Sequence, residues 1–247
     1  MNSNTLTVSQ ALHKATDYQK AGQFAKAEQL YRQILQIEPQ QPQALHFLGV
    51  LATQAGQYAA AVTLMQRAVA TGKANPACYG DLGHALIAQE QWAAATQAYT
   101  QAIRQQPELI LQYGHHLAHT LKRQGLLSQA IQCYQELLQG DLPKAEIIHN
   151  NLANIYKQQG QLEYAIQHYQ QALQLKADYL NAHNNLANTY KEQGQLSLAI
   201  QHYQQALTLY PKQPELHNNL GTLFQAQGQL TQALSHYNQA LSLNPNL

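Results

Sequence analysis

Small, bulky and turn-forming residues recur along the chain at a nearly constant spacing. Three intervals between the turn residues are 34 residues and one is 35, and an interval of 69 residues fits two such periods with a single inserted residue. They are Gly22, Gly56, Gly125, Gly160, Gly194 and Gly228, with Glu90 at the equivalent place inside the long interval. A glycine can take the left-handed conformation that ends one helix before the next begins. The spacing therefore predicts seven helix pairs in tandem.

Each predicted pair also repeats three kinds of packing residue around its turn. A small residue stands seven positions before the turn, where helix backbones could approach closely. An alanine stands five positions after the turn, and a bulky residue four positions further on. The small residues are Ala15, Gly49, Gly83, Ala118, Ala153, Ala187 and Gly221. The alanines are Ala27, Ala61, Ala95, Ala130, Ala165, Ala199 and Ala233; the bulky residues are Tyr31, Met65, Tyr99, Tyr134, Tyr169, Tyr203 and Tyr237.

This pattern, closed by proline at Pro39, Pro107, Pro211 and Pro245, resembles the tetratricopeptide repeat (TPR) family over residues 8–247. The resemblance implies an all-α fold, a right-handed superhelical solenoid of seven TPR helix-turn-helix repeats whose first helices line a concave groove. Residues 1–7 would form an N-terminal extension. The predicted repeats span about 8–41, 42–75, 76–109, 111–144, 146–179, 180–213 and 214–247.

Some repeats depart from the pattern. Lys73 and Ala177 replace the closing proline in two repeats, the fourth repeat closes at Leu142-Pro143, and single extra residues fall near Ile110 and Ala145. We expect local changes of superhelical pitch at these places. The last three repeats are nearly copies of one another and should be the most regular.

Asparagine recurs on the first helices of those last three repeats. Each of these helices contains the same four-residue segment, His149-Asn150-Asn151-Leu152, His183-Asn184-Asn185-Leu186 and His217-Asn218-Asn219-Leu220. Two positions after each segment stand Asn154, Asn188 and Thr222, respectively. At 100° per residue, the asparagines and Lys157 fall on one face and His149, Leu152, Ala153 and Tyr156 on the opposite, packing face. Successive first helices should lie about 9–10 Å apart, close to three extended peptide residues. A carboxamide can both donate to and accept from a peptide backbone.

The asparagines also support a narrower resemblance, to the repeat arm of O-linked N-acetylglucosamine transferase. That resemblance implies that Asn151, Asn185 and Asn219 grip the backbone of a bound peptide. The residues predicted to bind a peptide are Asn150, Asn151, Asn154, Lys157, Asn184, Asn185, Asn188, Lys191, Asn218 and Asn219, with His115, His119, Lys122 and Arg123. An alternative is that the asparagines only bond between neighbouring helices. The chaperone-tail clamp of the family is incomplete, because Asn150 stands where a lysine is needed.

A second group of polar residues lies in the third and fourth repeats. His115, His116 and His119 share a helix face with Lys122 and Arg123, and Asp81 and His84 lie one repeat earlier. Histidines at i and i+4 can hold zinc. The two adjacent cations oppose a metal ion, so we predict no metal and no cofactor, and a mildly basic stretch suited to an acidic or phosphorylated segment.

Composition narrows the class of protein. Fourteen Lys and Arg balance thirteen Asp and Glu, which gives a net charge of +1 and no basic stripe for nucleic acid. About forty glutamines follow the repeat rather than a tract. Cys78 and Cys133 have no metal-ligand spacing. No catalytic motif stands apart from the repeat, so we predict a non-enzymatic scaffold that binds a protein or peptide.

The chain ends carry further expectations. We see no secretory signal and no run long enough to insert into a membrane, so we expect a cytoplasmic protein. The seventh repeat has no polar cap, which leaves Leu234, Tyr237 and Leu241 without a following helix. This predicts either self-association through the C-terminal repeat or a longer protein. In the second case the chain would be a substrate-recruiting arm of a multidomain enzyme such as a glycosyltransferase.

Overall fold

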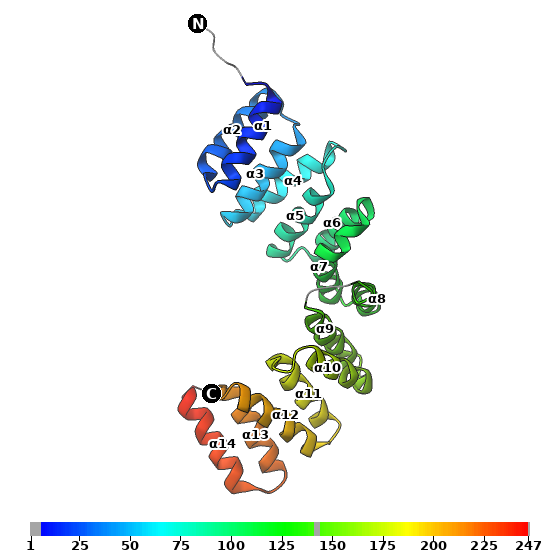
Figure 1. Ribbon diagram of the computed structural model, residues 1–247, viewed down its shortest axis with the longest axis vertical. Helices are drawn as coiled ribbons and strands as arrows, with labels where there is room; N and C mark the ends of the chain where they lie inside the picture. Colours follow the sequence, from blue (N-terminus) through cyan, green and yellow to red (C-terminus); the bar gives the residue numbers. More distant parts are fainter. Residues whose placement is uncertain (1–5, 141–143, 247) are drawn as a thin grey trace. The chain divides into compact units, whose positions relative to one another are not determined.

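A computed structural model describes residues 6–140 and 144–246 of the protein. Residues 1–5 of the predicted extension and the predicted closure at Leu142-Pro143 lie outside this part. The described residues form fourteen α-helices and no strand, joined in sequence as antiparallel pairs (Figure 1). The prediction of an all-α helical repeat solenoid is confirmed.

The seven helix pairs follow one another along the chain. They are α1 (Val8–Lys20) and α2 (Phe24–Ile37), α3 (Pro42–Gln54) and α4 (Tyr58–Ala70), α5 (Pro76–Ala88) and α6 (Trp92–Gln105), α7 (Ile110–Arg123) and α8 (Leu127–Leu137), α9 (Ala145–Gln158) and α10 (Leu162–Leu175), α11 (Leu180–Glu192) and α12 (Leu196–Leu209), and α13 (Pro214–Ala226) and α14 (Leu230–Leu243). A 3₁₀ turn, η1 (Pro107–Leu109), follows α6, near the extra residue expected beside Ile110.

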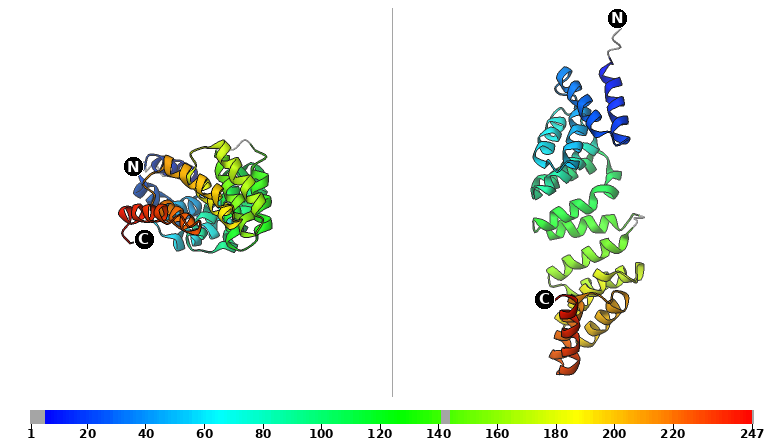
Figure 2. Two further views of the ribbon diagram at one scale, coloured as in Figure 1. Left: turned by 90° about the horizontal axis from the view of Figure 1, so that it is seen from below. Right: turned by 90° about the vertical axis from the view of Figure 1, so that its left-hand side faces the viewer.

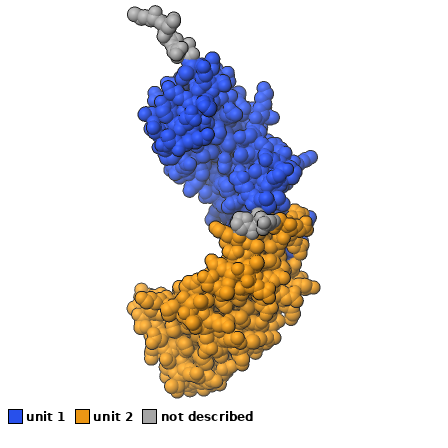
Figure 3. All heavy atoms as spheres, in the orientation of Figure 1, with its two compact units in different colours: residues 1–133 blue, residues 134–247 orange. Residues whose placement is uncertain are grey.

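The chain divides into two compact units, residues 1–133 and 134–247, with the boundary inside α8 (Figure 3). Within unit 1, each helix from α1 to α7 packs on the next, and within unit 2 each helix from α9 to α14 does the same. Figure 2 shows this succession within each unit from two further sides. The first helices also touch across repeats, α3 with α5 and α9 with α11.

The turn inside each pair is set by one residue in the left-handed conformation. The six predicted glycines have φ between +72° and +76°, and Glu90 takes the same region at +56°. Left-handed backbone costs a residue with a Cβ more than it costs glycine. The predicted turns are therefore confirmed, with Glu90 as the strained member of the series.

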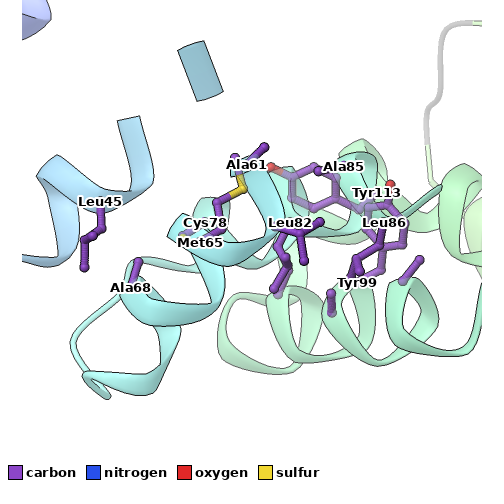
Figure 4. Packing of buried hydrophobic residues seen from close by; sticks show 14 residues of the cluster. Leu45, Ala61, Met65, Ala68, Cys78, Leu82, Ala85, Leu86, Tyr99 and Tyr113 are labelled. Carbon is purple, nitrogen blue, oxygen red and sulfur yellow. The ribbon is translucent and has the colours of Figure 1, made fainter. Parts of the chain in front are cut away.

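The predicted packing positions form the core. Tyr31, Tyr99, Tyr169 and Tyr203 have no exposed surface, and the alanines five residues after each turn are buried. In unit 1 the rings of Tyr99 and Tyr113 lie among buried leucines and alanines of α5 (Figure 4). Gly83 makes room for this packing, since a Cβ there would come within 2.7 Å of the Tyr99 ring.

Candidate functional site

The asparagines of unit 2 lie on the first helices α9, α11 and α13. Asn151, Asn184, Asn185, Asn218 and Asn219 are half-buried, and Asn150 is buried at 4% exposure. We call these six residues the asparagine face. The apolar side of the same helices, with Leu152 and Leu186 buried, packs into the repeats as predicted.

One hydrogen bond joins the asparagine face across two repeats. Asn185 Nδ2 donates to Asn150 Oδ1 at 3.1 Å. This bond fixes both amide planes and leaves the Asn185 carbonyl oxygen without a partner in the described residues. The side chains of Asn151 and Asn219 make no hydrogen bond within that part of the chain, so their donors and acceptors are available to a ligand.

Asn154 and Asn188 hold their own repeats together. Asn154 Oδ1 accepts from the Tyr169 hydroxyl at 2.5 Å, and Asn188 Oδ1 accepts from the Tyr203 hydroxyl at 2.8 Å. These two bonds fit the alternative in which asparagines bond between helices. Each satisfies a tyrosine hydroxyl on a buried ring, and burial raises the pKa of both tyrosines above its usual value.

The lysines of unit 2 differ in their surroundings. Lys157 Nζ, predicted to bind the peptide, forms an ion pair with Glu192 Oε1 at 2.9 Å, which neutralises its charge. Lys191 is exposed. A basic groove surface in this unit therefore has weaker support than the amide surface has.

In unit 1 an ionic bridge occupies the place of the amide bridge. His46 Nε2 lies 2.7 Å from Asp81 Oδ2, and His84 Nδ1 lies 3.9 Å from Asp81 Oδ1. His46 and Asp81 are 35 residues apart, as are Asn150 and Asn185. Burial raises the pKa of Asp81, but the hydrogen bonds from His46 and His84 outweigh it, so the pKa is lowered.

The predicted histidine and basic residues come together on α7 beside α5 and α6. The rings of His84 and His116 are 4.5 Å apart, and His115 contacts His116. The Arg123 guanidinium lies 4.6 Å from the ring of Trp92, which also meets His119. We call His115, His116, His119, Lys122 and Arg123 the α7 basic cluster.

The pKa values of the three histidines in the α7 basic cluster are lowered, which favours their neutral form. Burial lowers the pKa of His116 to about 4, with smaller effects from His84, His115 and His119. Burial also lowers the pKa of His115 and His119, and Arg123 and Lys122 lower the latter further. Among the described residues, no three His, Cys, Asp or Glu side chains are arranged to hold a metal ion.

Sequence reasoning missed several members of these surfaces. His46, Trp92 and Glu192 were not singled out, yet each contacts a residue that was. The signal was the offset of 35 residues, which relates His46 to Asp81 and Lys157 to Glu192. Among the described residues, the buried Tyr99 hydroxyl and His46 Nδ1 have no hydrogen-bond partner, and the sequence did not predict this.

These observations define a helical-repeat protein with polar surfaces on its first helices. Tetratricopeptide repeat models match residues 18–80, 52–113 and 214–247, and a TPR repeat model matches 153–194 and 187–228. The chain belongs to the tetratricopeptide repeat family. Proteins of this family are generally non-enzymatic scaffolds that bind protein partners. Residues 114–152 lie outside these matches and contain most of the fourth repeat, where the pattern departs most.

Solved structures with the same fold have little sequence in common with the chain. The C-terminal part of a TPR repeat-containing protein from Cytophaga hutchinsonii is 16% identical, with a TM-score of 0.79 over 96% of this chain and 96% of that one. MamA protein is 20% identical, with a TM-score of 0.62 over 69% of this chain and 92% of its own. No curated protein gives a significant sequence match. The narrower likeness to the transferase arm stays a prediction.

None of the helices in residues 6–140 and 144–246 combines the length and the apolar character needed to span a membrane.

Proposed function

We propose that the protein is an interaction scaffold that binds an extended segment of a partner along its first helices, with the asparagine face as the main contact. The observation that carries this proposal is that amides at equivalent positions of successive repeats keep donors or acceptors that no other described residue uses. Within residues 6–140 and 144–246, the side chains of Asn151 and Asn219 have no hydrogen-bond partner, and the Asn185 carbonyl oxygen has none. Amides spaced by one repeat suit the repeating donors and acceptors of an extended backbone.

The residues that contact the bound segment directly are the sixth residues of the last three repeats, Asn151, Asn185 and Asn219. Asn150 is buried and bonded to Asn185, which fits a positioning role. Asn154 and Asn188 are engaged by tyrosines, so they support the helix pairs behind the surface. Asn184, Asn218 and Lys191 would widen the contact.

The α7 basic cluster would bind an acidic or phosphorylated part of the partner. Lys122 and Arg123 supply positive charge, and His115 and His119 lie on the same helix as donors. An anion bound here would raise the histidine pKa values. By linkage, its affinity should rise as the pH falls toward the lowered pKa values of the free histidines.

The test uses peptides selected from a displayed random library, each about ten residues long, to pass three repeats at roughly 3.3 Å per residue. Binding to the whole chain is measured by calorimetry for the wild type and for the triple variant Asn151→Ala, Asn185→Ala, Asn219→Ala. Loss of three amide hydrogen bonds at about 0.5–1.5 kcal/mol each should weaken binding at least about tenfold.

A matched control changes three exposed residues on the second helices, Gln167→Ala, Gln201→Ala and Ser235→Ala, and should leave affinity unchanged. Circular dichroism and thermal unfolding show whether either variant loses its fold. Equal affinity of the asparagine variant and the control would overturn the proposed contact. A joint loss of helicity and binding would favour a structural role for the asparagines.

Self-association through the last repeat is a second proposal about partners. Leu230, Leu234 and Leu241 of α14 are 62%, 61% and 46% exposed, whereas Ile200 and Leu207 at equivalent positions of α12 pack against the core. The opposite end differs, because Ser9, His13 and Lys14 of α1 are polar and exposed. Two copies would therefore meet α14 to α14.

Light scattering tests this association. A dimer that becomes a monomer on Leu234→Lys would support it, and a monomeric wild type at high concentration would contradict it. The alternative of an arm that recruits substrates for a larger enzyme uses the same asparagine face. A catalytic domain encoded beyond residue 247 would support that alternative.

A further inference from the structure

Three pairs of histidines in unit 2 lie away from the proposed contact surface. In each pair, a histidine of the first helix faces a histidine 19 residues later on the second helix. The pairs are His149 with His168, His183 with His202, and His217 with His236. Their Nδ1 atoms are 3.0, 3.4 and 3.0 Å apart, respectively. The arrangement therefore recurs in three consecutive repeats.

The corresponding positions of unit 1 hold no such pair. The residues there are Ala11 and Leu30, Leu45 and Leu64, Tyr79 and Ala98, and Gly114 and Cys133. In the last of these, the Cys133 thiol donates to the Gly114 carbonyl oxygen at 3.3 Å. The packing position thus accepts apolar or small residues, and a titratable pair is not required by the repeat fold.

The rings of each pair meet edge to edge. Ring centroids are 5.3, 5.6 and 5.3 Å apart, so each centroid distance exceeds the nitrogen distance by about two ring radii. The two nitrogens therefore lie close to the line between the centroids, as in a straight N–H···N hydrogen bond. A metal ion held by both nitrogens would need lone pairs that converge off this line. The geometry favours a shared proton.

One pair has its tautomers fixed by a backbone contact. His183 Nε2 lies 2.9 Å from the Ala177 carbonyl oxygen, which can only accept, so Nε2 carries the hydrogen. Neutral His183 then has a bare Nδ1, and His202 must donate its own Nδ1–H to it. His202 keeps an unprotonated Nε2, the atom where the pair can take up a further proton.

We propose that each pair is a one-proton latch between the two helices of its repeat, stable when it carries one N–H between the rings and opened when acid protonates both histidines. A single added proton at an outer nitrogen preserves the bond. A second added proton makes both Nδ1 atoms N–H donors that point at each other, and it brings two positive charges together. The open repeat can bind both protons, and the closed repeat cannot.

The surroundings of the pairs offer no compensating charge. From the packed helices, His168 meets His149 and Tyr156 of α9, and its side chain also bonds to Gln171 of its own helix. His202 meets His183 and Tyr190 of α11, and His236 meets His217 and Phe224 of α13. Within the described residues, the histidines ion-paired to carboxylates are His13, His46 and His84, all in unit 1.

The pKa directions agree with this geometry. Burial lowers the pKa of His202 to about 4, with a smaller effect of His183, and lowers the pKa of His149. Burial followed by the paired imidazole lowers the pKa of His168 and His236. An opened repeat titrates near 6.5, so the latch contributes fully above that pH. Its contribution is lost as the pH falls toward about 4.

Hydrogen exchange of the whole chain, followed by mass spectrometry and corrected for the intrinsic rate, tests the latch. Between about pH 6.5 and 4, the opening constant of α9–α14 should rise as the pH falls, by up to about a hundredfold per pH unit for each pair that opens, because the open pair binds up to two more protons than the closed pair. The variant His168→Gln, His202→Gln, His236→Gln keeps a hydrogen-bonding partner but removes one titrating ring per pair. Its pH slope should be smaller. The exposed His13→Gln is the control and should keep the full slope.

An unchanged slope in the triple variant would overturn the proposal. If that variant does not fold, ¹⁵N NMR of the wild type decides. The latch requires opposite tautomers in His183 and His202, and a coupling between their Nδ1 nuclei across the hydrogen bond. Identical tautomers, or six histidines that titrate independently near their ordinary pKa, would contradict it.

Discussion

The two units place their histidines in different parts of the same repeat. In unit 1, His46, His84 and the histidines of α7 lie on the polar side of first helices, beside Asp81 and two cations. In unit 2, all six histidines lie between the two helices of a repeat, and the polar side carries asparagine instead. The repeat fold accepts either arrangement. The two units therefore differ in the part of the repeat that contains groups titrating with pH. In unit 1 this part is the polar side of the first helices, and in unit 2 it is the contact between the two helices of a repeat.

The bridges between repeats show the same contrast. His46 with Asp81 and Asn150 with Asn185 join residues 35 positions apart. A 34-residue repeat thus brings a residue near the one that follows its equivalent in the next repeat. Unit 1 fills this contact with an ionisable pair, and unit 2 fills it with amides whose hydrogen bond does not depend on pH. The comparison can be tested by exchanging these features.

The largest expected effect concerns the small residue that admits a buried tyrosine. Gly83→Ala in unit 1 would place a Cβ within 2.7 Å of the Tyr99 ring, which has no exposed surface. We expect overpacking to lower the free energy of unfolding by about 1–3 kcal/mol, measured by urea denaturation. Ala187→Gly at the equivalent place of unit 2 should cost about 1 kcal/mol through helix propensity. An unchanged free energy of unfolding in Gly83→Ala would show that the Tyr99 ring can move to make room for the Cβ.

A smaller effect separates the buried tyrosines. The Tyr203 hydroxyl donates to Asn188, whereas the buried Tyr99 hydroxyl has no partner in the part of the chain that the structure describes. Tyr203→Phe should therefore destabilise the protein by about 1 kcal/mol, and Tyr99→Phe should be neutral or stabilising. Thermal unfolding of the two variants measures the difference. Equal losses would mean that the Tyr99 hydroxyl is satisfied in solution.

The ionic bridge of unit 1 should give a pH-dependent effect of similar or smaller size. The lowered pKa of Asp81 means that its contribution is present above about pH 3.8 and is lost as the pH falls through the lowered value. The variant His46→Asn, Asp81→Asn copies the amide bridge of unit 2. Hydrogen exchange in α3 and α5 should depend less on pH below 4 in the variant than in the wild type. An identical profile would rule out this role of Asp81.

The smallest effect is expected at the ion pair of Lys157 and Glu192. Its side chains are 25% and 49% exposed, so screening by water and salt limits its contribution to about 0.2–1 kcal/mol. Lys157→Met should lower stability by that amount at low salt and by less at high salt. Glu192→Gln should match it. A loss that does not change with salt would indicate packing by the lysine stem instead.

The sequence predicts the fold because each repeat contains the residues that form its own turn and its own core. The glycine at Gly160, the alanine at Ala165 and the tyrosine at Tyr169 recur in phase, and all three take the predicted places. Glu90 shows that the phase, and not the residue type alone, locates a turn. These are local properties of one helix pair, so no knowledge of the tertiary arrangement is needed.

The site was less predictable, because its contacts join different helices. Helical periodicity places Asn150 and Asn185 on one polar face, but it does not show that they bond to each other and that Asn150 becomes buried. Periodicity also assigns His149 and His168 to packing positions without revealing a shared proton. Such features depend on the angle and rise between helices, which a single-helix pattern does not contain.

The central claim is that the asparagine face contacts the backbone of a bound segment. The most direct measurement is the ¹⁵N NMR spectrum of the side-chain amides, recorded for the whole chain with and without a library-selected peptide. We expect the largest chemical-shift changes at the side-chain amides of Asn151, Asn185 and Asn219, whatever the side chains of the peptide. Unchanged resonances for these three amides, with shifts concentrated on the second helices, would contradict it.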